Sequence, residues 1–140
     1  MKPVTARCYP ATLLPLVNKF YKSHRSAMRA NTGALLWGLE QNAEQVAALC
    51  LAAHDKGFWL TGLFVAPNWR QQGFGHQLVR TVQSHYQQPL WLFCHPELTS
   101  WYQRVGFQRA TTLPAALQER LQRYQQHKVL VALQWLPSED

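Results

Sequence analysis

The sequence is short of acidic residues: 7 Asp and Glu stand against 14 Lys and Arg, which gives a formal net charge of +7. Such an excess attracts anions, including nucleic acids, membrane surfaces and phosphorylated ligands. The basic residues are scattered along the chain rather than gathered into a dense run. This scatter favours a solvated basic surface over a nucleic-acid groove.

Cysteine and long apolar runs are also scarce. Cys8, Cys50 and Cys94 are odd in number, and they do not stand in the Cys/His spacing of a zinc site. The first residues lack the apolar stretch of a signal peptide, and the longest apolar run, 46–53, is too short to cross a membrane. We therefore expect free thiols, no metal, no membrane partner and a cytoplasmic protein.

What is present is typical of a folded domain. The 140 residues, 47% of them hydrophobic, predict a single domain over 1–140. A helix is expected to open at Pro10 with Leu13, Leu16, Val17 and Phe20 on one face, and 21–33 is expected to be irregular or partly helical. Further helices are expected near 74–86, 96–104 and 113–124, and strands near 4–9, 34–41, 45–53, 58–65, 90–94, 107–109 and 129–136.

The order of these elements predicts a mixed sheet. The strands at 34–41 and 45–53 flank a turn at Asn42 and Ala43, which indicates an antiparallel hairpin. The strand, helix and strand from 58 to 94 call for parallel pairing with a right-handed crossover. The run 58–65 is almost continuously apolar, so this strand is expected to be central and covered on both faces.

Two glycines stand one residue apart where that central strand gives way to a helix. The stretch NWRQQGFGHQLV contains Gly73 and Gly75, although glycine has a low propensity for both strands and helices. The first amides of a helix have no acceptor within it and suit a phosphate group. Bare backbone at both glycines lets a phosphate approach these amides, whereas a tight structural turn is the alternative explanation.

Two blocks of this sequence resemble the GNAT superfamily of acyl-CoA-dependent N-acyltransferases. The first is Arg70-Gln71-Gln72-Gly73-Phe74-Gly75, and the second is Trp101-Tyr102-Gln103-Arg104-Val105-Gly106-Phe107. The resemblance covers 59–107 well, and the residues before it match only in the order of elements. It implies an α/β (α+β) fold with a mixed, mostly antiparallel sheet of about seven strands, a strand–glycine loop–helix–strand unit, and helices on both faces.

The resemblance also implies a site for acetyl-CoA, the co-substrate. Tyr102 matches the family's general acid, which protonates the departing thiolate, and His95 stands where many members carry an asparagine that contacts the cofactor. The strand backbone of Leu63, Phe64 and Val65 would pair with the pantetheine arm. The pyrophosphate would be held by the loop residues Arg70, Gln71, Gln72, Gly73, Phe74, Gly75 and His76.

The base that removes the proton of the attacking amine is less evident. The segment 92–107 looks especially like the arylalkylamine N-acetyltransferases, but Trp59 and Thr61 stand where those enzymes carry two histidines of a proton relay. Glu40 and His95 are the leading base candidates, and Glu97 is a third. Each of these residues also has a purely structural interpretation, and Cys94 is expected to be a buried strand cysteine rather than a nucleophile.

These features predict an N-acetyltransferase that moves an acetyl group from acetyl-CoA to a primary amine by direct attack. The acceptor is a small molecule or a peptide, and a basic entrance formed by Tyr21, His24, Arg25 and Arg29 would suit an acceptor with a carboxylate. A non-catalytic acyl-CoA-binding regulatory module remains the alternative. The sequence leaves open the acceptor, the acyl length and the oligomeric state, including a homodimer.

Overall fold

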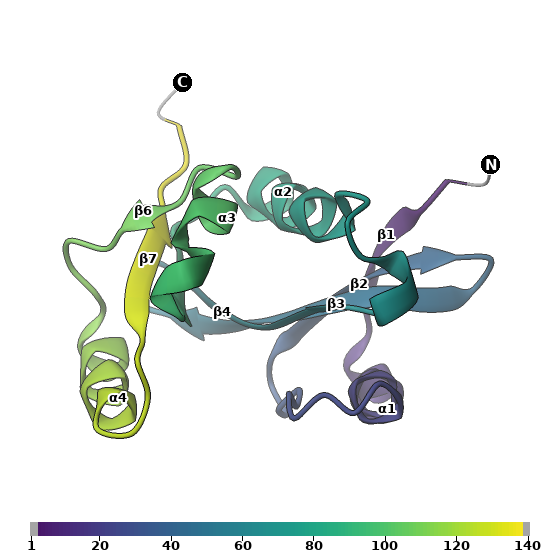
Figure 1. Cartoon of the computed structure of the whole chain (residues 1–140), viewed down its shortest axis with the longest axis horizontal. Helices are drawn as coiled ribbons and strands as arrows, with labels where there is room; N and C mark the ends of the chain where they lie inside the picture. Colours follow the sequence, from purple (N-terminus) through teal and green to yellow (C-terminus); the bar gives the residue numbers. More distant parts are fainter. Residues whose placement is uncertain (1–2, 139–140) are drawn as a thin grey trace. The chain divides into compact units, whose positions relative to one another are not determined.

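The computed structural model describes residues 3–138, and Figure 1 shows its elements. Seven strands and four α-helices occur in these residues. The strands are β1 (Thr5–Tyr9), β2 (Leu35–Gln41), β3 (Glu44–His54), β4 (Gly57–Val65), β5 (Leu90–Cys94), β6 (Gln108–Arg109) and β7 (Val131–Trp135), and the helices are α1 (Leu14–Ser23), α2 (Phe74–Tyr86), α3 (Thr99–Gln103) and α4 (Ala115–Gln125).

The strands are hydrogen-bonded in the order β1-β2-β3-β4-β5-β7-β6. The pairs β1–β2, β2–β3, β5–β7 and β6–β7 are antiparallel. The two strands joined through α2, β4 and β5, are parallel, as the strand–helix–strand order requires. The prediction of a mixed, mostly antiparallel sheet of about seven strands is confirmed.

Residue contacts divide the chain into two compact units. The first unit comprises 3–52 and 60–82, and the second comprises 53–59 and 83–138. The strand β4 therefore contributes its beginning to the second unit and its remainder to the first. Each unit is described by itself below.

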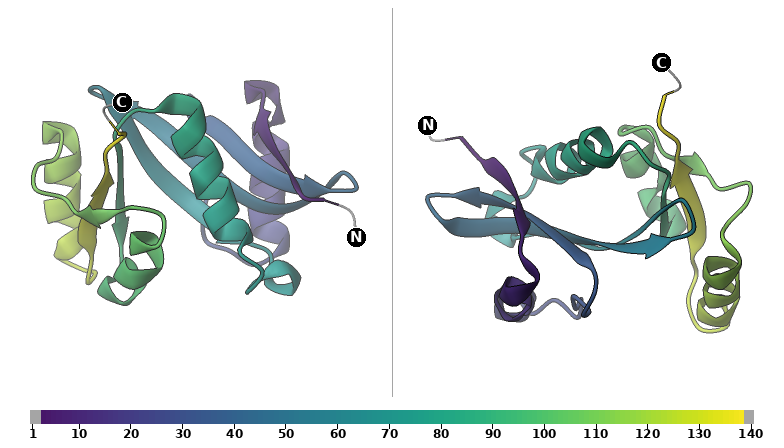
Figure 2. Two further views of the ribbon diagram at one scale, coloured as in Figure 1. Left: turned by 90° about the horizontal axis from the view of Figure 1, so that it is seen from above. Right: turned by 180° about the vertical axis from the view of Figure 1, so that it is seen from behind.

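In the first unit, α1 and α2 lie on opposite faces of β2, β3 and β4, as the views in Figures 1 and 2 agree. Apolar side chains from the strands and both helices are excluded from water, which is the main source of stability in such a layered arrangement. The fully buried members include Val17, Leu36, Leu39, Leu49, Leu51, Leu78 and Val79.

The first helix differs from its prediction in where it begins and in what it buries. A short 3-10 helix (Ala11–Leu13) follows Pro10, and α1 itself begins at Leu14. Leu16 is 55% exposed, whereas Tyr21 is 1% exposed. The predicted buried face was wrong at Leu16 because the real face follows Val17, Phe20 and Tyr21, at spacings of three and four residues.

In the second unit, α3 and α4 lie on opposite sides of β5 and β7 (Figure 2). The fully buried leucines of this unit are Leu90, Leu92, Leu117 and Leu133. The buried amide of Gln83 donates to the carbonyl of Val105 at 2.7 Å, so its polar group is satisfied. Each unit thus has its own apolar core with helices on both faces of its strands.

The strand β4 is central in the strand order, but it is less covered than its apolar sequence predicted. Gly57 and Leu60 are buried, whereas residues 61–65 are half-buried. Its pairing with β5 consists of Phe58 with Leu90 and Trp59 with Trp91 in the described residues. The predicted cover on both faces was therefore wrong for 61–65, which lie beyond this short ladder.

Three further features concern the thiols, the length of the helices and possible metal ligands. Cys8, Cys50 and Cys94 are free, the first exposed and the other two buried. Within residues 3–138, none of the helices has the length and apolar character needed to cross a membrane. The same described part of the chain contains no group of three or more His, Cys, Asp or Glu side chains that could hold a metal ion.

Candidate active site

The glycine loop lies in the first unit, between β4 and α2. A 3-10 turn (Pro67–Trp69) leads into it, and Gln71 and Gly73 both have left-handed backbones, with φ of 64° and 81°. The carbonyl of Gly73 accepts the first helical hydrogen bond from the Gln77 amide at 3.0 Å. Gly73 is therefore the N-cap of α2, which begins at Phe74 as the sequence predicted.

This junction is open on the side of Gly73. A Cβ atom built there would have no other atom within 4 Å. The amides of Phe74 and Gly75 belong to the first helical turn, so they have no acceptor within the helix. Open space beside a helix N-terminus suits an anion, because the amides and the helix dipole both favour negative charge.

Arg70 joins the loop to the end of β4. Its Nε donates to the carbonyl oxygen of Val65 at 2.8 Å, and its guanidinium carbon lies 5.1 Å from the centre of the Phe64 ring. The structure thus brings three predicted cofactor residues, Phe64, Val65 and Arg70, together. One lone pair of the Val65 carbonyl is engaged by this contact, and the second can still accept.

Tyr21, which the sequence analysis placed at the acceptor entrance, is instead a buried residue that fixes the backbone of β4. The hydroxyl of Tyr21 donates to the carbonyl of Gly62 at 2.6 Å, and the Cys50 sulfur lies 3.7 Å from the same hydroxyl. Gly62 has a φ of 66°, and a Cβ atom there would lie 2.7 Å from the Tyr21 oxygen. A glycine inside an apolar strand was the available signal, because it marks a bulge or a close approach.

Tyr102, the predicted general acid, lies in the second unit on α3. It is 9% exposed, and its ring packs edge-on against Trp101 and Phe107, with centroid distances of 4.9 Å and 5.6 Å. Burial, together with the nearby Cys94 thiol, raises the pKa of its hydroxyl above the usual value. The hydroxyl makes no hydrogen bond with residues 3–138, so it remains a protonated donor for a ligand.

The two leading base candidates both have structural partners. The carboxylate of Glu40, on β2, accepts from the Tyr9 hydroxyl at 2.6 Å and from Arg7 at 3.4 Å. His95, which follows β5, caps a short 3-10 helix: its Nδ1 accepts from the amide of Glu97 at 3.2 Å. These contacts engage Oε2 of Glu40 and Nδ1 of His95, and the base role of either residue stays a prediction.

The predicted entrance residues are only partly gathered. His24 packs against Phe20 and Phe64, with ring centroids 5.0 Å and 6.2 Å away. Tyr21 points inward to Gly62 instead of lining an entrance. Arg29 is exposed.

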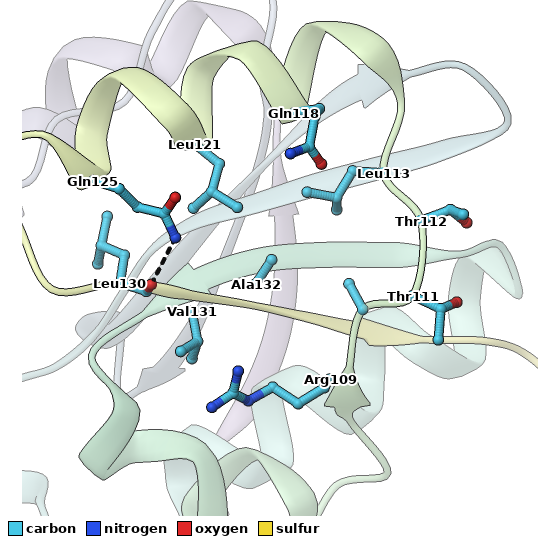
Figure 3. A pocket seen from close by; sticks show the side chains of 11 residues that line it. Arg109, Thr111, Thr112, Leu113, Gln118, Leu121, Gln125, Leu130, Val131 and Ala132 are labelled. Atoms are coloured by element: carbon cyan, nitrogen blue, oxygen red, sulfur yellow. Dashed lines mark hydrogen bonds between the residues drawn. The ribbon is translucent and has the colours of Figure 1, made fainter.

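A pocket of about 220 Å³ lies in the second unit between α4 and the strands β6 and β7 (Figure 3). Its lining includes the apolar side chains of Leu121 and Val131 and the polar groups of Thr111 and Gln118. None of the predicted cofactor or catalytic residues lines it. The pocket is thus separate from the residues on which the chemistry was predicted to depend.

A comparison with protein-family models matches residues 32–109 to the acetyltransferase (GNAT) domain, which is more than half of the chain. The chain belongs to the GNAT acetyltransferase family, and it is accordingly an acyltransferase. The family resemblance drawn from the two sequence blocks is confirmed. No curated protein matches the sequence significantly.

Solved structures with the same fold have little sequence in common with this chain. N-acetylglutamate synthase from Neisseria gonorrhoeae, complexed with coenzyme A and N-acetyl-glutamate, is 14% identical with a TM-score of 0.70. That match covers 99% of this chain but 36% of the synthase, so this chain spans about a third of it. The ribosomal-protein-S18-alanine N-acetyltransferase from Escherichia coli is 17% identical with a TM-score of 0.69, over 99% of this chain and 96% of that one.

A third similar structure contains the co-substrate. It is a GNAT family acetyltransferase from Elizabethkingia anophelis with acetyl-CoA bound, 15% identical with a TM-score of 0.62. The match covers 95% of this chain and 97% of that one. At this level of identity the three structures establish the fold, and they confirm the predicted architecture.

Proposed function

We propose that this protein transfers an acetyl group from acetyl-CoA to the primary amine of a small molecule or peptide. The observation that carries the proposal is the hydroxyl of the largely buried Tyr102 side chain, which keeps its proton and makes no hydrogen bond with residues 3–138. A donor of this kind suits the protonation of a departing thiolate. Membership of the GNAT acetyltransferase family supports the same reaction.

The first unit supplies features that suit the binding of acetyl-CoA. The amides of Phe74 and Gly75, at the open N-terminus of α2, would hold the pyrophosphate, together with the loop residues Arg70 to His76. The strand backbone of Leu63, Phe64 and Val65, which are half-buried residues, would accompany the pantetheine arm. The thioester supplies the acyl group, and the residues of this chain orient it.

The chemical step is direct attack by a neutral amine. The nitrogen lone pair forms a bond to the thioester carbonyl carbon, the carbon–sulfur bond breaks, and the sulfur takes the proton of the Tyr102 hydroxyl. The attacking nitrogen must also lose a proton, either to Glu40 or His95 or to water. One atom of each side chain, Oε2 of Glu40 and Nδ1 of His95, is already engaged in a structural contact.

We further propose that residues 1–140 act as one N-acetyltransferase domain. The match to the Escherichia coli enzyme over 96% of that chain supports this, as does the strand order that includes all seven strands. The alternative function, a non-catalytic acyl-CoA-binding module, requires the loop but not the Tyr102 hydroxyl.

Release of free CoA thiol from acetyl-CoA, followed with a thiol reagent across a panel of amines and peptides, tests the proposal. We expect amine-dependent release that the Tyr102→Phe variant loses. A protein that binds acetyl-CoA but acetylates nothing in a broad panel would instead be the regulatory module.

A further inference from the structure

A group of aromatic and cationic side chains gathers around Trp59 in the second unit. The Trp59 cluster consists of His54, Trp59, Phe93, Arg120 and Tyr124. Trp59 packs against Phe93 at 5.4 Å and against His54 at 6.1 Å between ring centroids. The Arg120 guanidinium carbon lies 4.7 Å from the centre of the Trp59 ring, and Phe93 meets Tyr124 at 6.3 Å.

Two hydrogen-bond donors in this cluster have no acceptor. Among the described residues, the buried side-chain atoms without a hydrogen-bond partner are Trp59 Nε1, Arg120 Nε and Thr99 Oγ1. The first two belong to side chains that stack on one another. A buried donor without an acceptor costs about 1–3 kcal/mol, which an incoming acceptor atom would recover.

The cluster also has positive charge without a counter-charge. Arg120 makes no ion pair with a carboxylate in residues 3–138. Burial, reinforced by Arg120, lowers the pKa of His54, which keeps this imidazole neutral near pH 7. Lys128 lies over the Tyr124 ring at 5.5 Å and adds a second positive charge beside the cluster. The charges and free donors of this cluster therefore suit an anion.

The position of the cluster on β5 relates it to Tyr102. Phe93 belongs to the cluster, whereas the next residue, Cys94, acts electrostatically on Tyr102. Consecutive strand residues point to opposite faces, so the Trp59 cluster and Tyr102 lie on opposite faces of β5. In agreement, α4 and α3 lie on opposite sides of this strand (Figure 2). A ligand held by the cluster would thus approach from the face opposite the proton donor.

We propose that the Trp59 cluster binds the carboxylate of the amine acceptor, which makes the acceptor an amino acid or a peptide with a carboxylate near its amine. The proposal rests on the proposed acetyl transfer. A carboxylate can accept from the guanidinium through two parallel hydrogen bonds and from the indole N–H through a third. Both orphan N–H groups are covered in this structure, so binding requires the Arg120 side chain to shift along the indole ring.

A comparison of matched acceptors tests the proposal. Alanine, phenylalanine and glutamate are each assayed beside their α-carboxamides, as acceptors of acetyl from acetyl-CoA. We expect kcat/KM for at least one free acid to exceed that of its carboxamide about tenfold or more, since a charge-assisted hydrogen bond contributes roughly 1.5–3 kcal/mol. Arg120→Gln should abolish this preference, whereas Arg123→Gln, an exposed arginine of the same helix, should retain it.

The indole N–H of Trp59 provides a second measurement, which does not need activity. In ¹⁵N–¹H correlation spectra its signal is identified by its loss in Trp59→Phe. Phenylalanine, alanine or glutamate should shift this signal, and the corresponding carboxamides should not.

The outcomes separate the two proposals. Equal rates for acid and carboxamide, or a preference that survives Arg120→Gln, would overturn the carboxylate site while leaving acetyl transfer intact. If no amine is acetylated, the proposed function fails, and the indole signal alone tests the carboxylate site. A shift that is specific to the free acids would retain the site. The absence of a shift with any of the free acids would overturn it.

Discussion

The two units differ in whether the donors of their aromatic side chains have hydrogen-bond partners. In the first unit, the hydroxyl of Tyr9 donates to Glu40, and the hydroxyl of Tyr21 donates to the Gly62 carbonyl. In the second unit, the hydroxyl of Tyr102 and the indole N–H of Trp59 have no partner among residues 3–138. The three orphan buried side-chain atoms of the described residues, on Trp59, Thr99 and Arg120, all belong to the second unit. Buried polar groups normally find partners, so this difference assigns structural hydroxyls to the first unit and ligand-directed donors to the second.

The largest expected effect comes from Tyr102→Phe, which tests the second half of that contrast. Acetyl transfer should fall by about 10²–10⁴, as for loss of a general acid, with the low end favoured because water can substitute in part. The free energy of unfolding should change little, because the hydroxyl makes no hydrogen bond in the described residues. Steady-state kinetics and urea unfolding measure both quantities. Wild-type turnover in this variant would make the hydroxyl merely structural.

The pH profile of the wild-type enzyme sharpens the same point. Burial disfavours the charged phenolate and raises the pKa of Tyr102, so the hydroxyl keeps its proton through its ordinary pKa of about 10. The value of kcat/KM should rise with pH as the amine loses its proton, and it should not decline below about pH 10. A decline between pH 8 and 10 that vanishes in Tyr102→Phe would contradict this expectation.

Tyr21→Phe should produce the opposite pattern. Its hydroxyl donates to the Gly62 carbonyl at 2.6 Å, and removal leaves a buried acceptor without its donor. The free energy of unfolding should fall by about 1–3 kcal/mol, and turnover well below the melting temperature should be retained. Tyr102→Phe is the matched control, since the two variants lose the same atom from buried rings. Equal losses of stability in the two variants would contradict the proposed difference between the hydroxyls of the two units.

The first unit has its own unsatisfied donors, but they belong to the backbone at the start of α2. Gly75→Glu places a carboxylate among these amides and should weaken CoA affinity at least about tenfold, or about 1.4 kcal/mol. Ser84→Glu, at an exposed position near the end of the same helix, adds the same charge and should bind CoA normally. Calorimetric titration measures both. Unchanged affinity in a folded Gly75→Glu protein would remove the loop from the binding site.

The smallest effect is expected from Glu40→Gln. The amide oxygen of glutamine can still accept from Tyr9, and the half-exposed pair with Arg7 contributes little. Stability should fall by less than about 1 kcal/mol. Turnover should stay within about threefold of the wild type, with Arg7→Gln as the matched loss of the same ion pair. A hundredfold loss of turnover in Glu40→Gln alone would identify Glu40 as the base.

Much of the fold was predictable because local patterns agree with the tertiary structure. The hairpin, whose turn residues Asn42 and Ala43 both have left-handed backbones, follows from two strand-like segments that flank a short turn. The parallel pairing of β4 and β5 follows from the intervening helix. The buried face of α1 was harder, because Leu16 and Tyr21 lie at either side of the helical stripe and only packing decides which is covered.

The candidate site was predictable where a backbone conformation requires a particular residue type. Gly73 indicated the loop, because glycine is the residue that most readily adopts the left-handed backbone found there. The contact between Tyr21 and Gly62, and the stacking of Arg120 on Trp59, join residues 41 and 61 positions apart. A tyrosine in a polar segment or an arginine among scattered charges gives no local indication of such a partner.

The division of the chain has a consequence for attempts to make the protein in pieces. The sequence passes between the two units at 52–53, 59–60 and 82–83, so neither unit is a continuous stretch. A fragment beginning at residue 83 would contain β5 but not Phe58 and Trp59, its two partners in β4. A split version of this protein could therefore fold only when both fragments are expressed together and complement each other, and not from either fragment alone.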